Sequence, residues 1–117
     1  GFSMSSWGGR PTEDMMWSAA FTDDTEWNEA AWGNIVKTDA TKRFNELVRS
    51  ARSELDFEKR KSMYWECQAL CNYDGGAIVY AFNQYVGAGS KKLAHGDDVA
   101  GNWESDGNKI SERWWFA

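Results

Sequence analysis

The sequence predicts a mixed α/β fold of the α+β kind, with an αα-hairpin packed on a small mixed sheet. Three observations predict this fold class. Apolar residues recur at helical spacing over residues 40–54 and again over 57–73, with only a short gap between the stretches. A run rich in β-forming residues follows at 77–83. The chain then closes on the apolar residues 113–117, which would be exposed unless they packed back on the fold.

The N-terminal residues predict a strand that leads into a short helix. Alternation of apolar and small side chains places Phe2 and Met4 on one face of a strand over residues 1–10. Thr12 is placed to cap the helix that follows, whose first turn is acidic. Residues 21–39 are too rich in aromatic and aliphatic side chains for a free linker, so we expect an ordered loop there.

The two longer helices each carry a single apolar face, which predicts that they pack on each other. The faces comprise Phe44, Leu47, Val48 and Ala51 on the first helix and Met63, Cys67, Leu70 and Cys71 on the second. Asp56 is placed to cap the second helix, and Gly75-Gly76 to end it in a left-handed conformation. Cys67 and Cys71 are predicted to be buried, unbridged thiols, because a zinc site needs more ligands than they supply.

The C-terminal third combines strand-like and irregular sequence. Residues 77–83 are mostly apolar and predict a buried strand. Residues 89–108 are polar and rich in glycine. We expect residues 113–117 to return to the fold as a final strand, since an apolar end in water is unfavourable.

Composition argues against several classes of protein. The net charge of −5, from 13 Lys+Arg and 18 Asp+Glu, argues against binding to nucleic acid. The aromatic content of 15% is too high for a disordered tail. No apolar run approaches the roughly 18 residues that a membrane helix requires, and no signal peptide is evident. We therefore expect a folded chain without a nucleic-acid partner.

The residue patterns that usually carry catalysis are sparse. No nucleophile elbow and no HExxH zinc motif occurs, and the single histidine, His95, is predicted to lie in a surface loop. The acidic pairs Asp23-Asp24 and Asp97-Asp98 lack the spacing of a calcium loop and are predicted to be solvated. The sequence thus predicts a protein that is not an enzyme and that holds no cofactor or metal ion.

The segment Trp7-Gly8-Gly9-Arg10 is the best candidate for a binding site. It would present backbone amides and an indole beside a guanidinium, which suits a carboxylate contact. The alternative is that Trp7 belongs to the core and that Arg10 pairs with Glu13 or Asp14, and the residues leave both open. Three further tryptophans are expected to have packing roles: Trp27, Trp32 and Trp65.

A series of sequence blocks runs in order along the chain. The blocks are Trp7-Gly8-Gly9-Arg10-Pro11-Thr12-Glu13-Asp14, Trp27-Asn28-Glu29, Phe44-Asn45-Glu46-Leu47, Ala51-Arg52-Ser53-Glu54-Leu55-Asp56, Lys59-Arg60, Met63-Tyr64, Gln68, Asp74-Gly75-Gly76-Ala77-Ile78-Val79 and Glu112-Arg113-Trp114-Trp115-Phe116. In this order they resemble the C-terminal part of family 5 extracellular solute-binding proteins, the dipeptide- and oligopeptide-type binding proteins of bacterial ABC importers. The resemblance covers essentially the whole chain.

The resemblance implies a large two-lobed receptor with the type II periplasmic-binding-protein fold, of which residues 1–117 would be a C-terminal fragment. Residues 1–88 would form part of the C-terminal lobe, and residues 89–117 a tail that crosses back to the other lobe. The resemblance also implies a periplasmic or extracytoplasmic location and a membrane ABC permease as the partner of the full-length receptor.

The resemblance also places Trp7, Gly8, Gly9 and Arg10 at the ligand cleft of the receptor. Peptide receptors of the family resemble one another in an aspartate shortly after this tryptophan, which takes the amino group of the peptide. This sequence has Arg10 instead, and a cation attracts a carboxylate, so the implied ligand is a peptide-like or other small polar or anionic solute. Asp14 is the candidate partner for a ligand amine, which keeps peptides possible.

A hypothesis from another class is an autonomous, aromatic-rich interaction domain without a transport role. The importer hypothesis carries a physical expectation that helps to separate the two. A fragment cut from its other lobe exposes apolar surface around the tail or Phe2, so we expect the isolated chain to self-associate.

Overall fold

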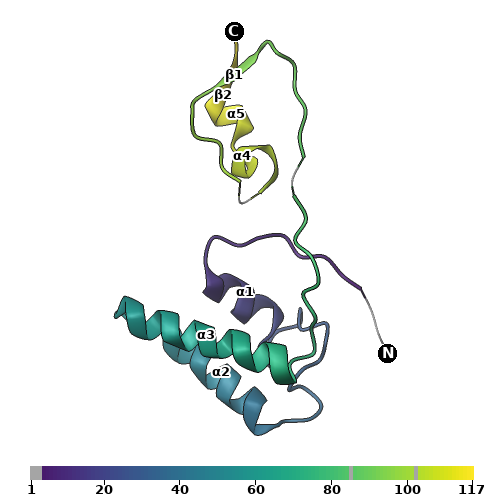
Figure 1. The fold of residues 1–117 in the computed structure, drawn as a ribbon, viewed down its shortest axis with the longest axis vertical. Helices are drawn as coiled ribbons and strands as arrows, with labels where there is room; N and C mark the ends of the chain where they lie inside the picture. The colour runs from purple at the N-terminus through teal and green to yellow at the C-terminus, as the bar shows by residue number, and fades with distance from the viewer. Residues whose placement is uncertain (1–3, 85, 102) are drawn as a thin grey trace. The chain divides into compact units, whose positions relative to one another are not determined.

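The computed structural model describes residues 4–84, 86–101 and 103–117. In this part of the chain, five helices and one two-stranded antiparallel sheet give a small α+β fold, in agreement with the general fold class predicted. The chain divides into two compact units (Figure 1). Residues 12–80 form one, which we call the helical unit, and residues up to 11 together with 81–117 form the other, which we call the terminal unit.

The helical unit is built from three helices. They are α1 (Glu13–Ala20), α2 (Asp39–Ala51) and α3 (Phe57–Asp74). The helices α2 and α3 lie side by side as the predicted αα-hairpin, and α1 packs against α2 (Figure 1). The first hairpin helix ends earlier than residue 54, because the next backbone N–H groups, of Ser53 and Glu54, bond to carbonyls three residues back rather than four.

Both hairpin helices begin at side-chain caps. Before α2, Thr38 Oγ1 accepts a hydrogen bond of 3.2 Å from the Thr41 N–H, and the Thr38 N–H donates one of 3.0 Å to Thr41 Oγ1. This reciprocal pair is a capping box. Before α3, Asp56 Oδ1 accepts a hydrogen bond of 2.9 Å from the Lys59 N–H, so the predicted Asp56 cap is confirmed.

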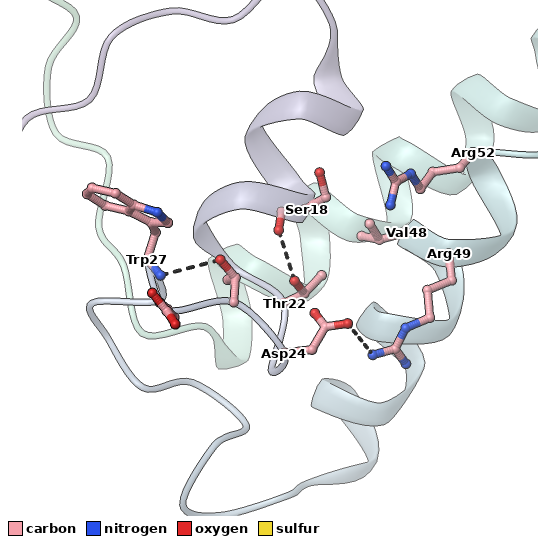
Figure 2. Close-up of a pocket in the computed structure, with 9 residues that line it drawn as sticks. Ser18, Thr22, Asp24, Trp27, Val48, Arg49 and Arg52 are labelled. Atoms are coloured by element: carbon pink, nitrogen blue, oxygen red, sulfur yellow. Dashed lines mark hydrogen bonds and ion pairs between the residues drawn. The ribbon is translucent and has the colours of Figure 1, made fainter.

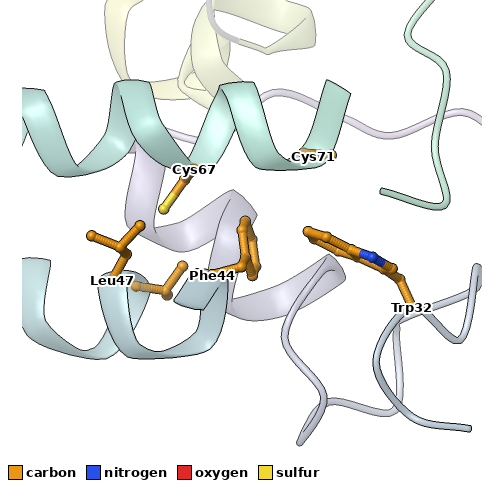
Figure 3. Packing of buried hydrophobic residues seen from close by; sticks show 6 residues of the cluster. Trp32, Phe44, Leu47, Cys67 and Cys71 are labelled. Carbon is orange, nitrogen blue, oxygen red and sulfur yellow. The ribbon is translucent and has the colours of Figure 1, made fainter. Parts of the chain in front are cut away.

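The core of the helical unit lies where α2 meets α3 (Figure 3). Its buried cluster consists of Trp32, Phe44, Leu47, Val48, Cys67 and Cys71, and the partly buried Trp17, Phe21, Met63 and Leu70 pack against it. Phe44 is 0% exposed, and its ring centroid lies 5.6 Å from that of Trp17 and 4.8 Å from that of Trp32. The two predicted apolar faces therefore pack on each other, and the packing role of Trp32 is confirmed.

Trp27 and Trp65 do not share that role. Their side chains are 64% and 61% exposed, so the prediction that they are packing residues is wrong for both. On α3, the Trp65 ring instead makes a cation–π contact with the Lys61 ammonium, whose Nζ lies 4.9 Å from a ring centroid. Both residues lie away from the surface where the two helices meet, and nothing in the described helical unit requires their burial.

Cys67 and Cys71 are free and buried, as predicted. Burial raises the pKa of the Cys67 thiol to about 12 and also raises that of Cys71, because a thiolate is poorly solvated in an apolar core. Both thiols stay protonated near neutral pH and serve as small apolar side chains.

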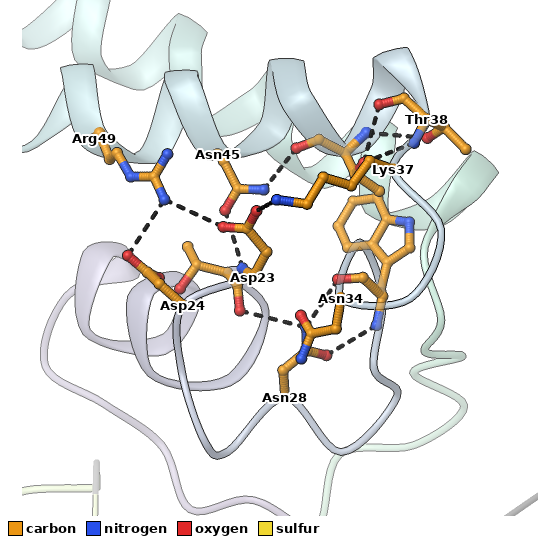
Figure 4. A network of polar contacts seen from close by, with 11 residues as sticks. Asp23, Asp24, Asn28, Asn34, Lys37, Thr38, Asn45 and Arg49 are labelled. Atoms are coloured by element: carbon orange, nitrogen blue, oxygen red, sulfur yellow. Dashed lines mark hydrogen bonds and ion pairs between the residues drawn. The ribbon is translucent and has the colours of Figure 1, made fainter.

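The stretch between α1 and α2 forms the predicted ordered loop, and Asn28 organises it (Figure 4). The Asn28 side chain is 6% exposed. Its Oδ1 accepts a hydrogen bond of 3.2 Å from the Trp32 N–H, and its Nδ2 donates to the carbonyls of Trp32 at 2.8 Å and Thr22 at 3.3 Å. These bonds satisfy backbone groups that would otherwise be buried without partners.

The predicted buried strand at 77–83 is absent. Ile78 and Phe82 are 81% and 92% exposed, and the only sheet in the described part of the chain pairs two other segments. An extended segment becomes a buried strand only when a neighbouring strand takes up its N–H and C=O groups and another layer covers its side chains. The described part of the chain supplies neither to this segment.

Gly75, at the end of α3, departs from the left-handed conformation that was predicted. Its φ of −69° and ψ of 158° are extended, and its N–H donates a hydrogen bond of 2.9 Å to the Cys71 carbonyl. The chain thus leaves α3 directly in an extended direction. Gly75 lies so close to the Cys71 carbonyl that an added Cβ would overlap it, which is a separate reason for glycine there.

Two N-terminal predictions also fail. Residues 4–10 form no strand, and Phe2 lies outside the described residues. Thr12 stands at the start of α1, but its side chain makes no capping hydrogen bond. Glu13 and Asp14, in the first turn, lie near the positive end of the helix dipole, where acidic groups are stabilising.

The sheet belongs to the terminal unit. Its strands β1 (Leu93–His95) and β2 (Trp114–Phe116) are antiparallel, with Leu93 opposite Phe116 and His95 opposite Trp114. The predicted return of the C-terminus as a strand is confirmed. The predicted mixed sheet is wrong, since it has two antiparallel strands only, and His95 lies in β1 rather than in a loop, although it is exposed.

Asp106 is the buried polar centre of the terminal unit, between β1 and β2 in sequence. It lies in α4 (Glu104–Asn108), which precedes α5 (Ile110–Arg113). Its side chain accepts hydrogen bonds from the Ala100 N–H, from Arg113 Nη1 at 3.0 Å and from Trp114 Nε1 at 3.1 Å. Ser105, Asp106 and Gly107 have positive φ values of 52°, 58° and 66°, so α4 is a left-handed turn.

Candidate functional site

The predicted binding segment, from Trp7 to Arg10, lies in the terminal unit and contacts Trp103. Gly8 approaches the Trp103 ring so closely that a Cβ at this position would overlap ring atoms. Glycine is therefore required while the ring keeps its place. Trp7 and Trp103 are both half-buried, so each has one part in contact with the protein and another in solvent.

Arg10 lies against the same ring. Its Cζ is 5.9 Å from a Trp103 ring centroid, which is within the range of a cation–π contact. The Arg10 side chain is exposed, and no Asp or Glu of the described residues forms an ion pair with it. Its guanidinium donors are thus available to an anionic ligand, in the fork geometry that suits a carboxylate.

Asp14, the remaining predicted site residue, belongs to the helical unit. Its Oδ1 lies 3.3 Å from Arg52 Nε, so Asp14 pairs with Arg52. That oxygen is buried and accepts no hydrogen bond within the described residues. Burial raises the pKa of the nearby Tyr64 hydroxyl, and the negative charges of Asp14 and Glu13 raise it further. The structure therefore groups Trp7 to Arg10 with Trp103, which the sequence did not single out, and gives Asp14 a different set of neighbours.

An open pocket of about 440 Å³ lies in the helical unit (Figure 2). Three parts of the chain line it: Ser18 and Thr22 from the end of α1 and its first following turn, residues 24–27 from the loop, and Val48 and Arg49 of α2 with Arg52 directly after it. Charged and hydroxyl groups dominate the lining, and the Trp27 indole stands at one side. We call it the α1–α2 pocket.

The charged groups of this pocket are linked to the polar network of the loop (Figure 4). Arg49 Nη2 lies 3.2 Å from both Asp23 Oδ1 and Asp24 Oδ2, and Lys37 Nζ lies 3.1 Å from Asp23 Oδ2. A hydrogen bond from the Thr22 side chain and the Arg49 guanidinium lower the pKa of Asp24. The Asp23 side chain is only 17% exposed, so the prediction of solvated acids is wrong for Asp23, whereas Asp24 is exposed.

Sequence reasoning missed the α1–α2 pocket because its walls come from separate segments. Two local signals could have drawn attention to it. Ser18 and Thr22 are four residues apart at the end of a predicted helix, and Arg49 and Arg52 are three apart and lie off the apolar stripe of the next helix. Such spacings place side chains on one helix face, but they do not show which faces meet.

No group of three or more His, Cys, Asp and Glu side chains among the described residues is arranged to hold a metal ion. No helix in this part of the chain combines the length and the apolar character needed to cross a membrane.

Comparisons with known proteins give no relative: no family model, no curated protein and no solved structure matches the chain.

Proposed function

We propose that this chain is the C-terminal portion of a family 5 type solute-binding receptor that serves an ABC importer and captures a peptide-like or other small polar or anionic solute. The type II periplasmic-binding-protein fold, the extracytoplasmic location and the membrane permease partner belong to the same proposal. The ordered sequence blocks from Trp7 to Phe116 support it. Such a receptor binds by closure of two lobes and has no catalytic role.

The single observation that carries the proposal is the setting of Arg10. Its exposed guanidinium lies over the Trp103 ring, one residue beyond the Gly8-Gly9 pair. An aromatic plane, backbone amides and an arginine fork together form the kind of surface that recognises a carboxylate next to an apolar group. In this proposal Trp7, Gly8, Gly9 and Arg10 contact the ligand. Asp14 belongs to the helical unit, where it pairs with Arg52, and is not part of this site.

The apolar side chains exposed in the segment after α3 support the proposal that the chain is part of a larger protein. Ile78, Val79 and Phe82 are 81%, 66% and 92% exposed. Exposed apolar side chains gathered in one segment are often covered by another part of the protein or by a partner. In the proposed receptor, the other lobe covers it.

Ligand binding by the intact receptor tests the proposal. The natural full-length product is purified, and the solute that accompanies it is identified by native mass spectrometry. Its affinity is then measured by titration calorimetry for the wild type, Arg10→Ala and Arg10→Lys. We expect Arg10→Ala to weaken binding by about tenfold or more, since a charged hydrogen bond is lost, and Arg10→Lys to weaken it less.

Arg43→Ala is the matched control, because Arg43 is an exposed arginine of α2 that pairs with Glu66 at 2.7 Å. Its substitution should leave affinity unchanged. Equal affinity of Arg10→Ala and the wild type would remove the carboxylate contact from the proposal. A natural product that carries no solute and no further lobe would overturn the importer role.

The same exposed segment favours one other candidate, an autonomous interaction domain that presents Ile78 and Phe82 to a partner. The two candidates differ in the state of the isolated chain. A receptor fragment should self-associate or bind apolar dyes through this segment, whereas an autonomous domain should remain a monomer in light scattering until its partner is added.

A further inference from the structure

The α1–α2 pocket carries a second inference. We propose that it binds a small zwitterion that bears a primary ammonium group and a carboxylate. Its volume of about 440 Å³ is within the range of small-molecule pockets, roughly 300–1,000 Å³. The proposal concerns the helical unit alone and does not rest on the importer role.

The wall formed by α1 and the start of the loop accepts hydrogen bonds. Ser18 Oγ donates to the Asp14 carbonyl at 2.6 Å, Thr22 Oγ1 to the Ser18 carbonyl at 3.1 Å, and Thr25 Oγ1 to the Ala19 carbonyl at 2.7 Å. A hydroxyl has one proton: those of Ser18 and Thr25 are committed to the backbone, and that of Thr22 is shared between the Ser18 carbonyl and Asp24. Thr22 is 3% exposed, and Thr25 Oγ1 also accepts a hydrogen bond of 3.3 Å from the Trp27 N–H. The acceptor that this wall offers a ligand is therefore chiefly Ser18 Oγ, which selects an N–H donor.

A negative group and an aromatic face stand next to this wall. Glu26 is exposed and forms no ion pair with any described residue, and the neighbouring Trp27 indole is 64% exposed. A carboxylate and an indole both attract an ammonium, the first by charge and the second by its π face. This side of the pocket therefore suits the ammonium end of a ligand.

The opposite side is formed by α2 and is positive (Figure 2). Arg52 is paired through Nε with Asp14 at 3.3 Å, and its side chain is 59% exposed. Its two Nη groups make no hydrogen bond within the described part of the chain, so they can donate in parallel to a carboxylate. Arg49, one turn earlier, is held by Asp23 and Asp24 and adds positive charge without needing to move.

The balance of charges favours a zwitterion over a singly charged ligand. Two carboxylates, Asp24 and Glu26, and two guanidinia, Arg49 and Arg52, line the pocket. Asp24 and Arg49 pair with each other at 3.2 Å, so Glu26 and the Nη groups of Arg52 are the charged groups left for a ligand, and a ligand with one charge meets only one of them. A ligand with an ammonium and a carboxylate meets both, and the Trp27 side chain lies beside the apolar part between its ends.

Three six-carbon probes test this inference on the whole chain: 6-aminohexanoate, hexylamine and hexanoate. Binding is followed at pH 7 and low salt by the NMR shifts of backbone amides of the pocket residues. We expect 6-aminohexanoate to bind at least about tenfold more tightly than either singly charged probe, because only it satisfies both walls. Equal binding of the three probes, or no binding of 6-aminohexanoate at millimolar concentration, would overturn the proposal.

Matched variants assign the two ends. Glu26→Gln should lower the affinity for 6-aminohexanoate to about that for hexanoate, and Arg52→Gln should lower it to about that for hexylamine. Glu29→Gln, an exposed glutamate of the same loop outside the pocket, is the control and should change nothing. Glu26 is on the surface, so its variant keeps the fold, and unchanged 6-aminohexanoate affinity in Glu26→Gln would contradict the assignment.

Discussion

Trp32 Nε1 donates a hydrogen bond of 3.1 Å to Asp74 Oδ2 and so ties the loop before α2 to the last residue of α3. The same oxygen accepts a second hydrogen bond of 3.1 Å from Thr38 Oγ1, at the residue that caps α2. One carboxylate thus holds two segments that are distant in sequence. It also orients the Trp32 indole, whose ring packs on Phe44 in the core.

Substitution of Asp74 tests this tie. Asp74→Ala removes both acceptor contacts and leaves the indole Nε1–H of Trp32 without its partner, so we expect the free energy of unfolding to fall by about 1–2 kcal/mol. Asp74→Asn keeps a carbonyl oxygen and should lose less. Urea titration followed by far-UV circular dichroism of the helices measures both. An unchanged midpoint in Asp74→Ala would show that the carboxylate does not stabilise the loop.

Phe44 is the side chain on which the core of the helical unit depends most. It is 0% exposed and contacts the rings of Trp17 and Trp32. We expect Phe44→Ala to destabilise the unit by about 3–5 kcal/mol, and Phe44→Leu by less, because a smaller cavity is left. Phe57→Ala is the control, since Phe57 is 62% exposed at the start of α3 and its loss should cost little. Thermal unfolding of the three variants compares the effects, and similar losses for Phe44→Ala and Phe57→Ala would contradict the assignment of the core.

Cys67 gives a chemical test of burial. Its pKa is raised to about 12, so almost no thiolate is present at pH 8 in the folded protein, whereas an unfolded cysteine has a pKa near 8.5. Because the folded value is the higher one, this group stabilises the fold fully below about pH 8.5, and the stabilisation is lost as the pH rises from there toward 12. We expect a thiol reagent at pH 8 to label Cys67 at least about a hundredfold more slowly in the folded protein than in denaturant. Equal rates would show that the thiol is accessible.

Asp106 gives a pH test in the terminal unit. The Ala100 N–H is the main cause of its lowered pKa, with the Trp114 indole and Arg113 acting in the same direction and desolvation opposing them. The folded pKa lies below the unfolded value, so the stabilisation is present above about pH 4 and is lost as the pH falls through the lowered folded pKa. We expect acid titration by NMR to show the indole N–H of Trp114 losing its hydrogen bond in this range.

The Asp106→Asn protein should show no such acid transition. The Asp97→Asn protein, changed at an exposed residue of the same unit, should still show it. An Asp106→Asn protein that still shows the Trp114 transition would assign it to another group.

The Gly8 contact can be tested independently of any ligand. Gly8→Ala adds a methyl group where the Trp103 ring now lies, so we expect the ring to be displaced and the Arg10 cation–π contact to be lost. Nuclear Overhauser contacts between residue 8 and the Trp103 ring report the change. Gly96→Ala is the control, because a Cβ there meets nothing within 4 Å, and the contacts between residue 8 and the ring should persist in it.

Sequence patterns predicted the parts of the fold that depend on near neighbours. Spacing within one helix determines the apolar faces that carry Phe44 and Cys67, and it also places the Asp56 cap. The short gap between the two helices then favours their packing on each other. The segment around Ile78 has the composition of a strand, but a strand is defined by a partner that its own residues do not specify. The same limit applies to Trp27, whose exposure depends on which surfaces meet.

The candidate sites show the same division. The turn from Trp7 to Arg10 was visible because its residues are consecutive, but its contact with Trp103 joins positions that no local pattern links. The sequence did not predict the α1–α2 pocket for the same reason: Ser18 lies in α1, Arg52 directly follows α2, and a long loop separates the two helices. Residue types suggested the chemistry, and only the tertiary arrangement shows which groups act together.

The exposed segment after α3 has a consequence for how the chain behaves while it folds. No charged side chain occurs from Gly75 to Ser90, between Asp74 and Lys91, and no proline interrupts this interval. Uncharged, β-prone stretches without such interruptions are the usual starting points of intermolecular cross-β assembly. The fraction of the isolated chain that stays in solution should therefore fall steeply as its concentration rises, and Phe82→Lys should raise that fraction.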